Sequence, residues 1–235
     1  MFATGSSSPS PMCPYFLVRN GFDNKAFVGA LLVDTYSKCG SLNEAVKVFE
    51  SVNEKDVVLW SSMIAGHGIH GFGSKAIETF EHMIKYSVRL NNVTFVPILS
   101  ACSHAGLVAE GRRIFRSMRE INGLTPDSEH CGVMVDLLDH TGELTEAVDL
   151  IEGLSSSAGP HAWRALLAGC RTHCIIEIGE FVGKNLLDME HNHAGYYNLL
   201  SNLYTFDGRW SCVAEVRGLM KERGEEDSWV QFNRG

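Results

Sequence analysis

A glycine that recurs at nearly constant intervals is the feature that most limits how this chain can fold. Gly40, Gly71, Gly106 and Gly142 are separated by 31, 35 and 36 residues. Glycine favours the left-handed backbone conformation at which helices end, so each glycine predicts a turn between two helices. In every copy a small residue lies five residues after the glycine, and a large apolar residue lies nine residues after it. The small residues are Ala45, Ala76, Gly111 and Ala147, and the large ones are Phe49, Phe80, Phe115 and Ile151.

The repeated unit is therefore a helical hairpin in which the small residue lets the two helices cross closely. Two further units, at 166–187 and 199–220, keep the pattern less strictly. The first has Cys174 at the position of the turn glycine, and the second keeps the glycine as Gly208 but has Val213 at the small position. One hairpin cannot cover its own apolar face, so neighbouring hairpins must stack in a row. The sequence predicts an all-α fold, an α-solenoid of about six hairpins wound into a right-handed superhelix.

Composition agrees with a folded domain in a reducing compartment. The 235 residues are 45% hydrophobic and 20% charged, which is sufficient for a sizeable core. No apolar run approaches the roughly 20 residues that a membrane-spanning helix needs. The seven cysteines are odd in number and scattered, which argues against a disulfide framework.

Charge is unevenly distributed along the chain. Residues 26–127 hold ten basic and ten acidic side chains, whereas residues 128–235 hold eight basic and seventeen acidic ones. A polyanion would be repelled by the acidic second part. If the chain binds nucleic acid, we expect the contact in the first part.

The repeats resemble those of plant pentatricopeptide repeat proteins of the PLS subfamily in their order, their lengths and their amino-acid residues. The resemblance rests on stretches such as "YSKCGSLNEAVKVF" and "HCGVMVDLLDHTGELTEA", and "HAWRALLAGCRTH" is similar to that subfamily's C-terminal E-type extension. The chain resembles a short form that lacks the DYW deaminase domain. Residues 1–25 then form a tail with the remnant of an L-type repeat. The remaining segments are an S repeat (26–56), a P repeat (57–91), an L repeat (92–127), a second S repeat (128–159), a TPR-like E extension (160–227) and a tail (228–235).

The resemblance implies sequence-specific binding of single-stranded RNA in mitochondria or chloroplasts, as a site-recognition factor for C-to-U editing that needs a deaminase in trans. Each repeat of the family meets about one base through two side chains, at its fifth and last positions. The resemblance therefore implies four pairs of RNA-binding residues: Ala30 with Asp56, Ser61 with Asn91, Val96 with Asp127, and Gly132 with Gly159.

Ser61 with Asn91 is the pair whose chemistry suits a base, because a hydroxyl and an amide both offer hydrogen bonds. The pair resembles the family combination that prefers adenine. The alternative is that both residues have structural roles only, Ser61 as an ordinary helix residue and Asn91 as an ordinary turn residue. Ala30, Val96 and Gly132 lack a hydrogen-bonding side chain and suit packing.

The sequence does not predict an enzyme, and it predicts neither a metal nor a cofactor. A zinc deaminase needs a His-x-Glu and a Cys-x-x-Cys, and neither spacing occurs in the chain. "CRTHC" places Cys170, His173 and Cys174 on one helix face, but no fourth ligand is evident.

The alternative function is a helical scaffold that binds proteins and little RNA. Under the editing hypothesis the expected partners are organelle RNA and editing-complex proteins, including a DYW-type deaminase, bound through the acidic E-like half.

Overall fold

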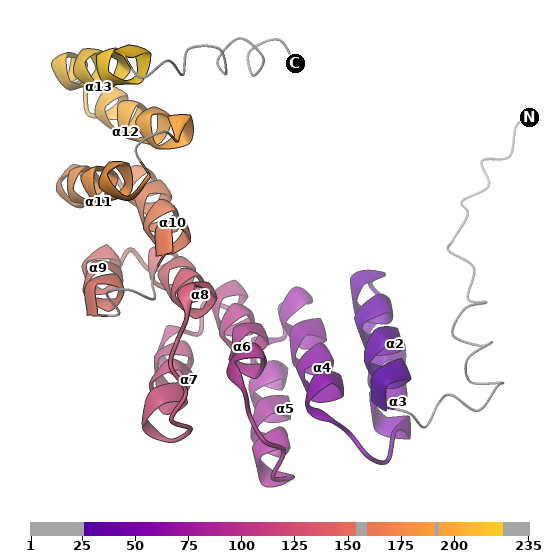
Figure 1. Ribbon diagram of the computed structural model, residues 1–235. Helices are drawn as coiled ribbons and strands as arrows, with labels where there is room; N and C mark the ends of the chain where they lie inside the picture. Colours follow the sequence, from indigo (N-terminus) through magenta and orange to yellow (C-terminus); the bar gives the residue numbers. More distant parts are fainter. Residues whose placement is uncertain (1–25, 154–158, 191–192, 223–235) are drawn as a thin grey trace, which may run out of the picture. The chain divides into compact units, whose positions relative to one another are not determined.

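The computed structural model describes residues 26–153, 159–190 and 193–222. These ranges form twelve α-helices and contain no strand, so the predicted all-α, helical-repeat fold is confirmed (Figure 1). The helices are short, from 10 residues in α3 to 14 in α11. None of the described helices has the length and apolar character needed to cross a membrane.

The chain divides into two compact units, and the first ends at Ala105. In this first unit α2, α4 and α6 pack side by side as one layer, and α3 and α5 pack against them as a second layer (Figure 1). Its helices are α2 (Ala26–Lys38), α3 (Leu42–Ser51), α4 (Val57–Ile69), α5 (Gly73–Lys85) and α6 (Asn92–His104).

The second unit begins at Gly106 and repeats this two-layer plan. Helices α8, α10 and α12 form one layer, and each packs on the helix that follows it in sequence, while α7 packs on α8. Its helices are α7 (Val108–Glu120), α8 (Ser128–Asp139), α9 (Leu144–Gly153), α10 (Gly159–Thr172), α11 (Ile176–Met189), α12 (Ala194–Phe206) and α13 (Trp210–Glu222).

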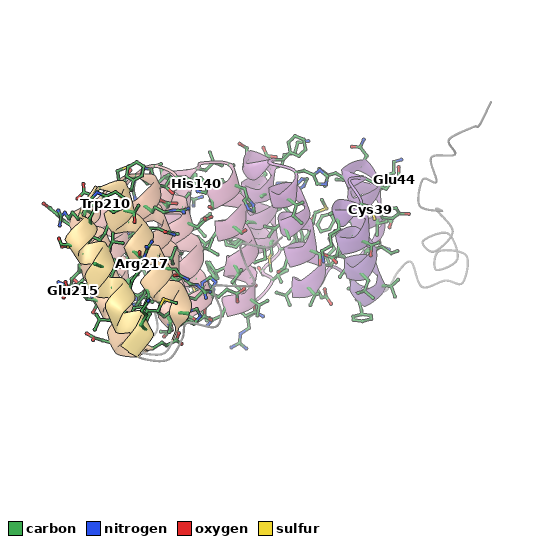
Figure 2. All side chains as sticks on the ribbon, turned by 90° about the horizontal axis from the view of Figure 1, so that it is seen from above. Cys39, Glu44, His140, Trp210, Glu215 and Arg217 are labelled. Atoms are coloured by element: carbon green, nitrogen blue, oxygen red, sulfur yellow. The ribbon has the colours of Figure 1, made fainter. Side chains whose placement is uncertain are left out.

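The turns within the hairpins have the backbone that the glycine pattern predicts. Gly40, Gly71, Gly106, Gly142 and Gly208 all have positive φ, from 64° to 79°. In the α2–α3 turn the N–H of Gly40 donates to the carbonyl of Ser37, and the next N–H reaches back to the carbonyl of Tyr36. This pair of bonds closes the helix end. The neighbouring side chains of Cys39 and Glu44 lie at the surface (Figure 2).

Cys174 shows that the turn is imposed by the repeat as a whole. It stands where the other copies have glycine, and it adopts the same left-handed conformation, with φ of 58°. The N–H of Ile175 donates to the carbonyl of Cys170 over 2.9 Å, which is the same closing bond. A left-handed non-glycine residue costs free energy, so the packing of α10 against α11 must outweigh that cost.

The small residues of the pattern lie in the interior. Ala45, Ala76 and Ala147 are completely buried, and Gly111 is also buried. In the first unit Phe80 packs edge-on against Phe95 of α6, with 5.7 Å between the ring centres. In the second unit the core follows the α8, α10 and α12 layer, with Leu138, Leu166, Tyr197 and Leu203 among its buried side chains. The core is therefore built from contacts between successive hairpins.

Candidate nucleic-acid interface

The fifth-position residues stand at the same register on four helices. Ala30, Ser61, Val96 and Gly132 are the fifth residues of α2, α4, α6 and α8. Ala30 and Gly132 are buried, whereas Ser61 and Val96 are partly exposed. In the first unit α2, α4 and α6 are neighbours, so the first three residues occupy the same position on adjacent helices.

Gly132 is covered by the following hairpin. A Cβ atom at Gly132 would lie 3.1 Å from Nδ1 of His161, at the start of α10. Gly159, its predicted partner, is the first residue of α10. This pair therefore offers backbone and the His161 ring, and it has no polar side chain of its own for a base.

Three of the four last-position residues share a structural role. Asp56, Asn91 and Asp127 are the N-caps of α4, α6 and α8. In each case a side-chain oxygen accepts a hydrogen bond from the backbone at the start of the helix, such as the N–H of Leu59 at 2.9 Å from Asp56. Such caps satisfy N–H groups that have no partner within the helix. The positions expected to meet bases therefore also begin the helices.

The capping bonds of Asn91 determine which of its atoms remain available. Its Oδ1 accepts from the N–H of Thr94 at 3.0 Å and from the Thr94 hydroxyl at 2.8 Å. A carbonyl oxygen has two lone pairs, and both are used. Asn91 is exposed, and its amide nitrogen has no partner among the described residues. Asn91 can therefore offer hydrogen-bond donors to a ligand.

Asp127 has the most extensive cap. Its Oδ1 accepts from the N–H of Glu129 at 3.0 Å and lies 2.6 Å from Nδ1 of His130, which is buried. Burial alone would raise the pKa of Asp127, but the hydrogen bonds from His130 and Glu129 outweigh it and hold the pKa below its ordinary value of 3.8. The carboxylate thus stabilises the fold above that value, and its contribution is lost as the pH falls through the lowered pKa.

We expect Asp127→Ala to lower the free energy of unfolding by about 1 kcal/mol at neutral pH, because it removes an N-cap. Asp127→Asn should keep most of the stability at neutral pH, since asparagine caps equally well. Urea denaturation followed by circular dichroism measures both. Asp149→Ala, at an exposed position inside α9, is the control and should change little. An Asp127→Ala protein as stable as the parent would contradict the capping role.

A row of exposed apolar side chains lies beside the fifth-position residues and was missed by the sequence reasoning. Phe27, Val58 and Val93, the second residues of α2, α4 and α6, are 67%, 52% and 72% exposed. Residues three apart share a helix face, so each lies next to the fifth residue of its helix. A detectable signal was present, because an apolar residue recurs at the second position of three successive repeats.

The "CRTHC" segment does not gather its side chains into a metal site. Cys170 is buried, and burial raises the pKa of its thiol to about 12. His173 is directed to α8, where its Nε2 lies 2.6 Å from the carbonyl oxygen of Asp139. No cluster of three potential ligands occurs within residues 26–153, 159–190 and 193–222.

Family models match most of the described chain. The PPR repeat model matches residues 31–57, 58–88 and 93–122, and the E motif model matches residues 173–230. The three PPR matches lie in the part of the chain from α2 to α7, and the E motif match begins after α10 and includes α11, α12 and α13.

Among similar curated proteins are two from Arabidopsis thaliana. A mitochondrial pentatricopeptide repeat-containing protein is 43% identical over 88% of this chain and 32% of its own length. The chloroplastic pentatricopeptide repeat-containing protein CRR2 is 39% identical over 93% of this chain and 34% of its own. The chain therefore spans about a third of the length of these relatives.

Solved structures share the fold. The crystal structure of the pentatricopeptide repeat protein PPR10 from maize matches 90% of this chain and 32% of its own, with a TM-score of 0.68 and 17% identity. PPR10 in complex with an 18-nt psaJ RNA element matches 89% of this chain and 33% of its own, with a TM-score of 0.59 and 18% identity. The predicted α-solenoid is therefore confirmed.

Proposed function

We propose that this chain, which belongs to the pentatricopeptide repeat family and carries an E motif, binds single-stranded RNA in organelle RNA processing. In this proposal the layer of α2, α4 and α6 faces the RNA. Each repeat meets about one base, so the chain selects a site by the order of its bases. We further propose that the selected site is a cytidine for C-to-U editing, and that a separate deaminase supplies the chemistry.

The observation that carries the RNA proposal is the arrangement around Ser61 and Asn91. Ser61 lies partly exposed on α4, and Asn91 caps the neighbouring helix α6 with its amide nitrogen unused. Val58 and Val93, one on each of these helices, expose apolar surface beside them. Bases have flat apolar faces and polar edges, and proteins bind them by contact with the face and hydrogen bonds to the edge.

The chemistry of this pair favours adenine over guanine. The Asn91 amide can donate to the ring nitrogen N1, and the Ser61 hydroxyl can accept from the exocyclic amino group. Guanine has an N–H at the same ring position, so the Asn91 amide and the guanine ring would present two donors to each other and form no hydrogen bond. The preference proposed from the family resemblance therefore has a chemical basis in the atoms left free by the cap.

Support for the organelle and RNA parts of the proposal comes from the relatives. Of two similar Arabidopsis proteins, one is named as mitochondrial and the other as chloroplastic. The maize protein with the similar fold was crystallised with RNA. The editing role and the deaminase partner rest on the resemblance to the PLS subfamily, and the excess of acidic residues after residue 127 suits contact with proteins.

We expect the purified chain to bind RNA weakly, with a dissociation constant in the micromolar range or above. Three or four repeats at about 1 to 3 kcal/mol for each good contact, with some contacts lacking a polar side chain, give roughly 4 to 8 kcal/mol. Micromolar affinity needs about 8 kcal/mol. Selection from random 20-nucleotide RNAs, followed by fluorescence anisotropy, measures affinity and base preference together.

Enrichment of adenine at one fixed position of the selected RNAs is the expected result. Failure to enrich any sequence, together with no detectable binding at protein concentrations of about 100 μM, would contradict the proposal. That outcome would favour the alternative, a helical scaffold for proteins.

A further inference from the structure

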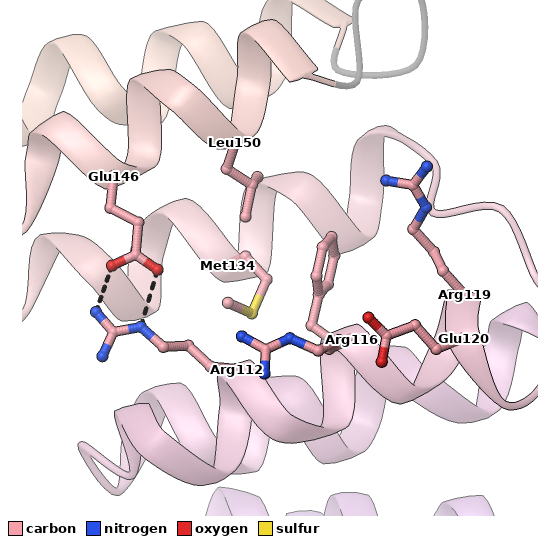
Figure 3. A pocket seen from close by; sticks show the side chains of 8 residues that line it. Arg112, Arg116, Arg119, Glu120, Met134, Glu146 and Leu150 are labelled. Atoms are coloured by element: carbon pink, nitrogen blue, oxygen red, sulfur yellow. Dashed lines mark hydrogen bonds and ion pairs between the residues drawn. The ribbon is translucent and has the colours of Figure 1, made fainter.

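A groove in the second unit runs between α7 and α9, above α8. Its volume is about 600 Å³. The side chains that line it come from all three helices and are drawn in Figure 3. They are Arg112, Phe115, Arg116, Arg119, Glu120, Met134, Glu146 and Leu150.

Arg112 closes one end of the groove and is already neutralised. Its Nε donates to Glu146 of α9 over 2.9 Å, and its terminal nitrogen also pairs with Glu146 (Figure 3). The same terminal nitrogen pairs with Glu143. Hydrogen bonds from Arg112 lower the pKa of Glu146, so this carboxylate stays ionised at neutral pH. The ion pairs join α7 to α9 and hold the walls of the groove.

Arg116 and Arg119 have no such partners. Both are exposed, and neither makes an ion pair with any residue in the described part of the chain. Glu120 is the one unpaired carboxylate among the lining residues, so the middle of the groove has an excess of positive charge. Guanidinium groups bind carboxylates through two parallel hydrogen bonds. Two free arginines in a groove therefore offer a place for acidic side chains.

The floor of the groove is apolar. Met134 of α8 is buried, and Phe115 and Leu150 line the groove as partly buried side chains from α7 and α9. Met134 is two residues beyond Gly132, so the two point to roughly opposite sides of α8. The groove thus lies on the side of α8 away from Gly132, the fifth-position residue of this helix.

We propose that this groove binds an acidic amphipathic segment of a partner protein, in which one or two carboxylates lie next to a large apolar side chain. The carboxylates would pair with Arg116 and Arg119, and the apolar side chain would pack on Phe115, Met134 and Leu150. An RNA strand suits the groove less well. A run of phosphates would have to pass the acidic residues of α9, which include Glu146, Asp149 and Glu152.

The test uses the full chain and a fluorescein-labelled peptide in which Glu-Glu-Leu-Phe is flanked by Gly-Ser spacers. Two control peptides replace the glutamates by glutamine or the Leu-Phe pair by serine, and a 20-nucleotide oligouridylate is the RNA control. The test variant is Arg116→Gln with Arg119→Gln. The matched control is Arg113→Gln with Arg171→Gln, which changes the charge equally at exposed positions outside the lining.

We expect the double variant at Arg116 and Arg119 to bind the acidic peptide about tenfold more weakly, because two charge-assisted contacts are lost. The matched control should bind as the parent does, and both control peptides should bind weakly. Equal peptide binding by the two double variants, or no peptide binding by the parent, would overturn the proposal. Tighter binding of oligouridylate than of the peptide, with the same loss in the test variant, would assign the groove to RNA instead.

Discussion

Replacing Gly68 with leucine should lower the free energy of unfolding by about 3 kcal/mol or more, because it overpacks a close contact between α4 and α6. A Cβ atom at Gly68 would lie 2.9 Å from the Cβ of Ala101 and 3.1 Å from its Cα, which is backbone. A flexible side chain could turn away, but here a helix would have to move. Gly68→Ala should be destabilising to a smaller extent. Urea denaturation measured by circular dichroism at 222 nm gives both values.

Gly218→Ala is the matched control for this prediction. Gly218 lies inside α13, and a Cβ there would meet no atom within 4 Å. Alanine favours a helix over glycine by up to about 1 kcal/mol, so Gly218→Ala should leave the stability unchanged or raise it. If Gly68→Ala behaved like Gly218→Ala, the two helices would not be as close as the structure places them.

The turns and the buried small residues were predictable because they depend on local backbone and on residue size. The glycine spacing located the left-handed residues, and the structure gives each of them positive φ. The same spacing located the buried small residues such as Ala76. The capping role of Asn91 and Asp127 also had a sequence signal, because each is followed three residues later by a side chain that can complete a capping box.

Contacts between hairpins were not predictable in the same way. Nothing near Gly132 in the sequence indicates that His161 lies against it, because the contact depends on how α10 packs on α8. The pairing of Arg112 with Glu146 spans 34 residues, about one repeat, and it depends on the side-chain conformations that packing selects. Repeats fix which helices are neighbours, but individual side chains decide what a surface can bind.

The cap at Asn91 makes one substitution unusually informative for RNA binding. Aspartate is as good an N-cap as asparagine, and Asp56 and Asp127 occupy the equivalent positions of α4 and α8. Asn91→Asp should therefore keep the bond from the N–H of Thr94 and the fold. The substitution replaces the side-chain amide nitrogen, which donates hydrogen bonds, by a second carboxylate oxygen, which accepts them.

Asn91→Asp should consequently change the preferred base from adenine to guanine, and the ratio of the two affinities should shift by about tenfold or more. The new acceptor matches the ring N–H and amino group of guanine, whereas it faces the lone pair of adenine N1. The added negative charge weakens binding of every RNA, but it cancels in the ratio. Competition between oligouridylates that carry one central adenine or guanine measures this ratio on the full chain. Asn92→Asp, with the same charge change one residue later, should leave the ratio unaltered. A ratio that is the same in the parent and in Asn91→Asp would show that Asn91 is a helix cap without a role in base selection.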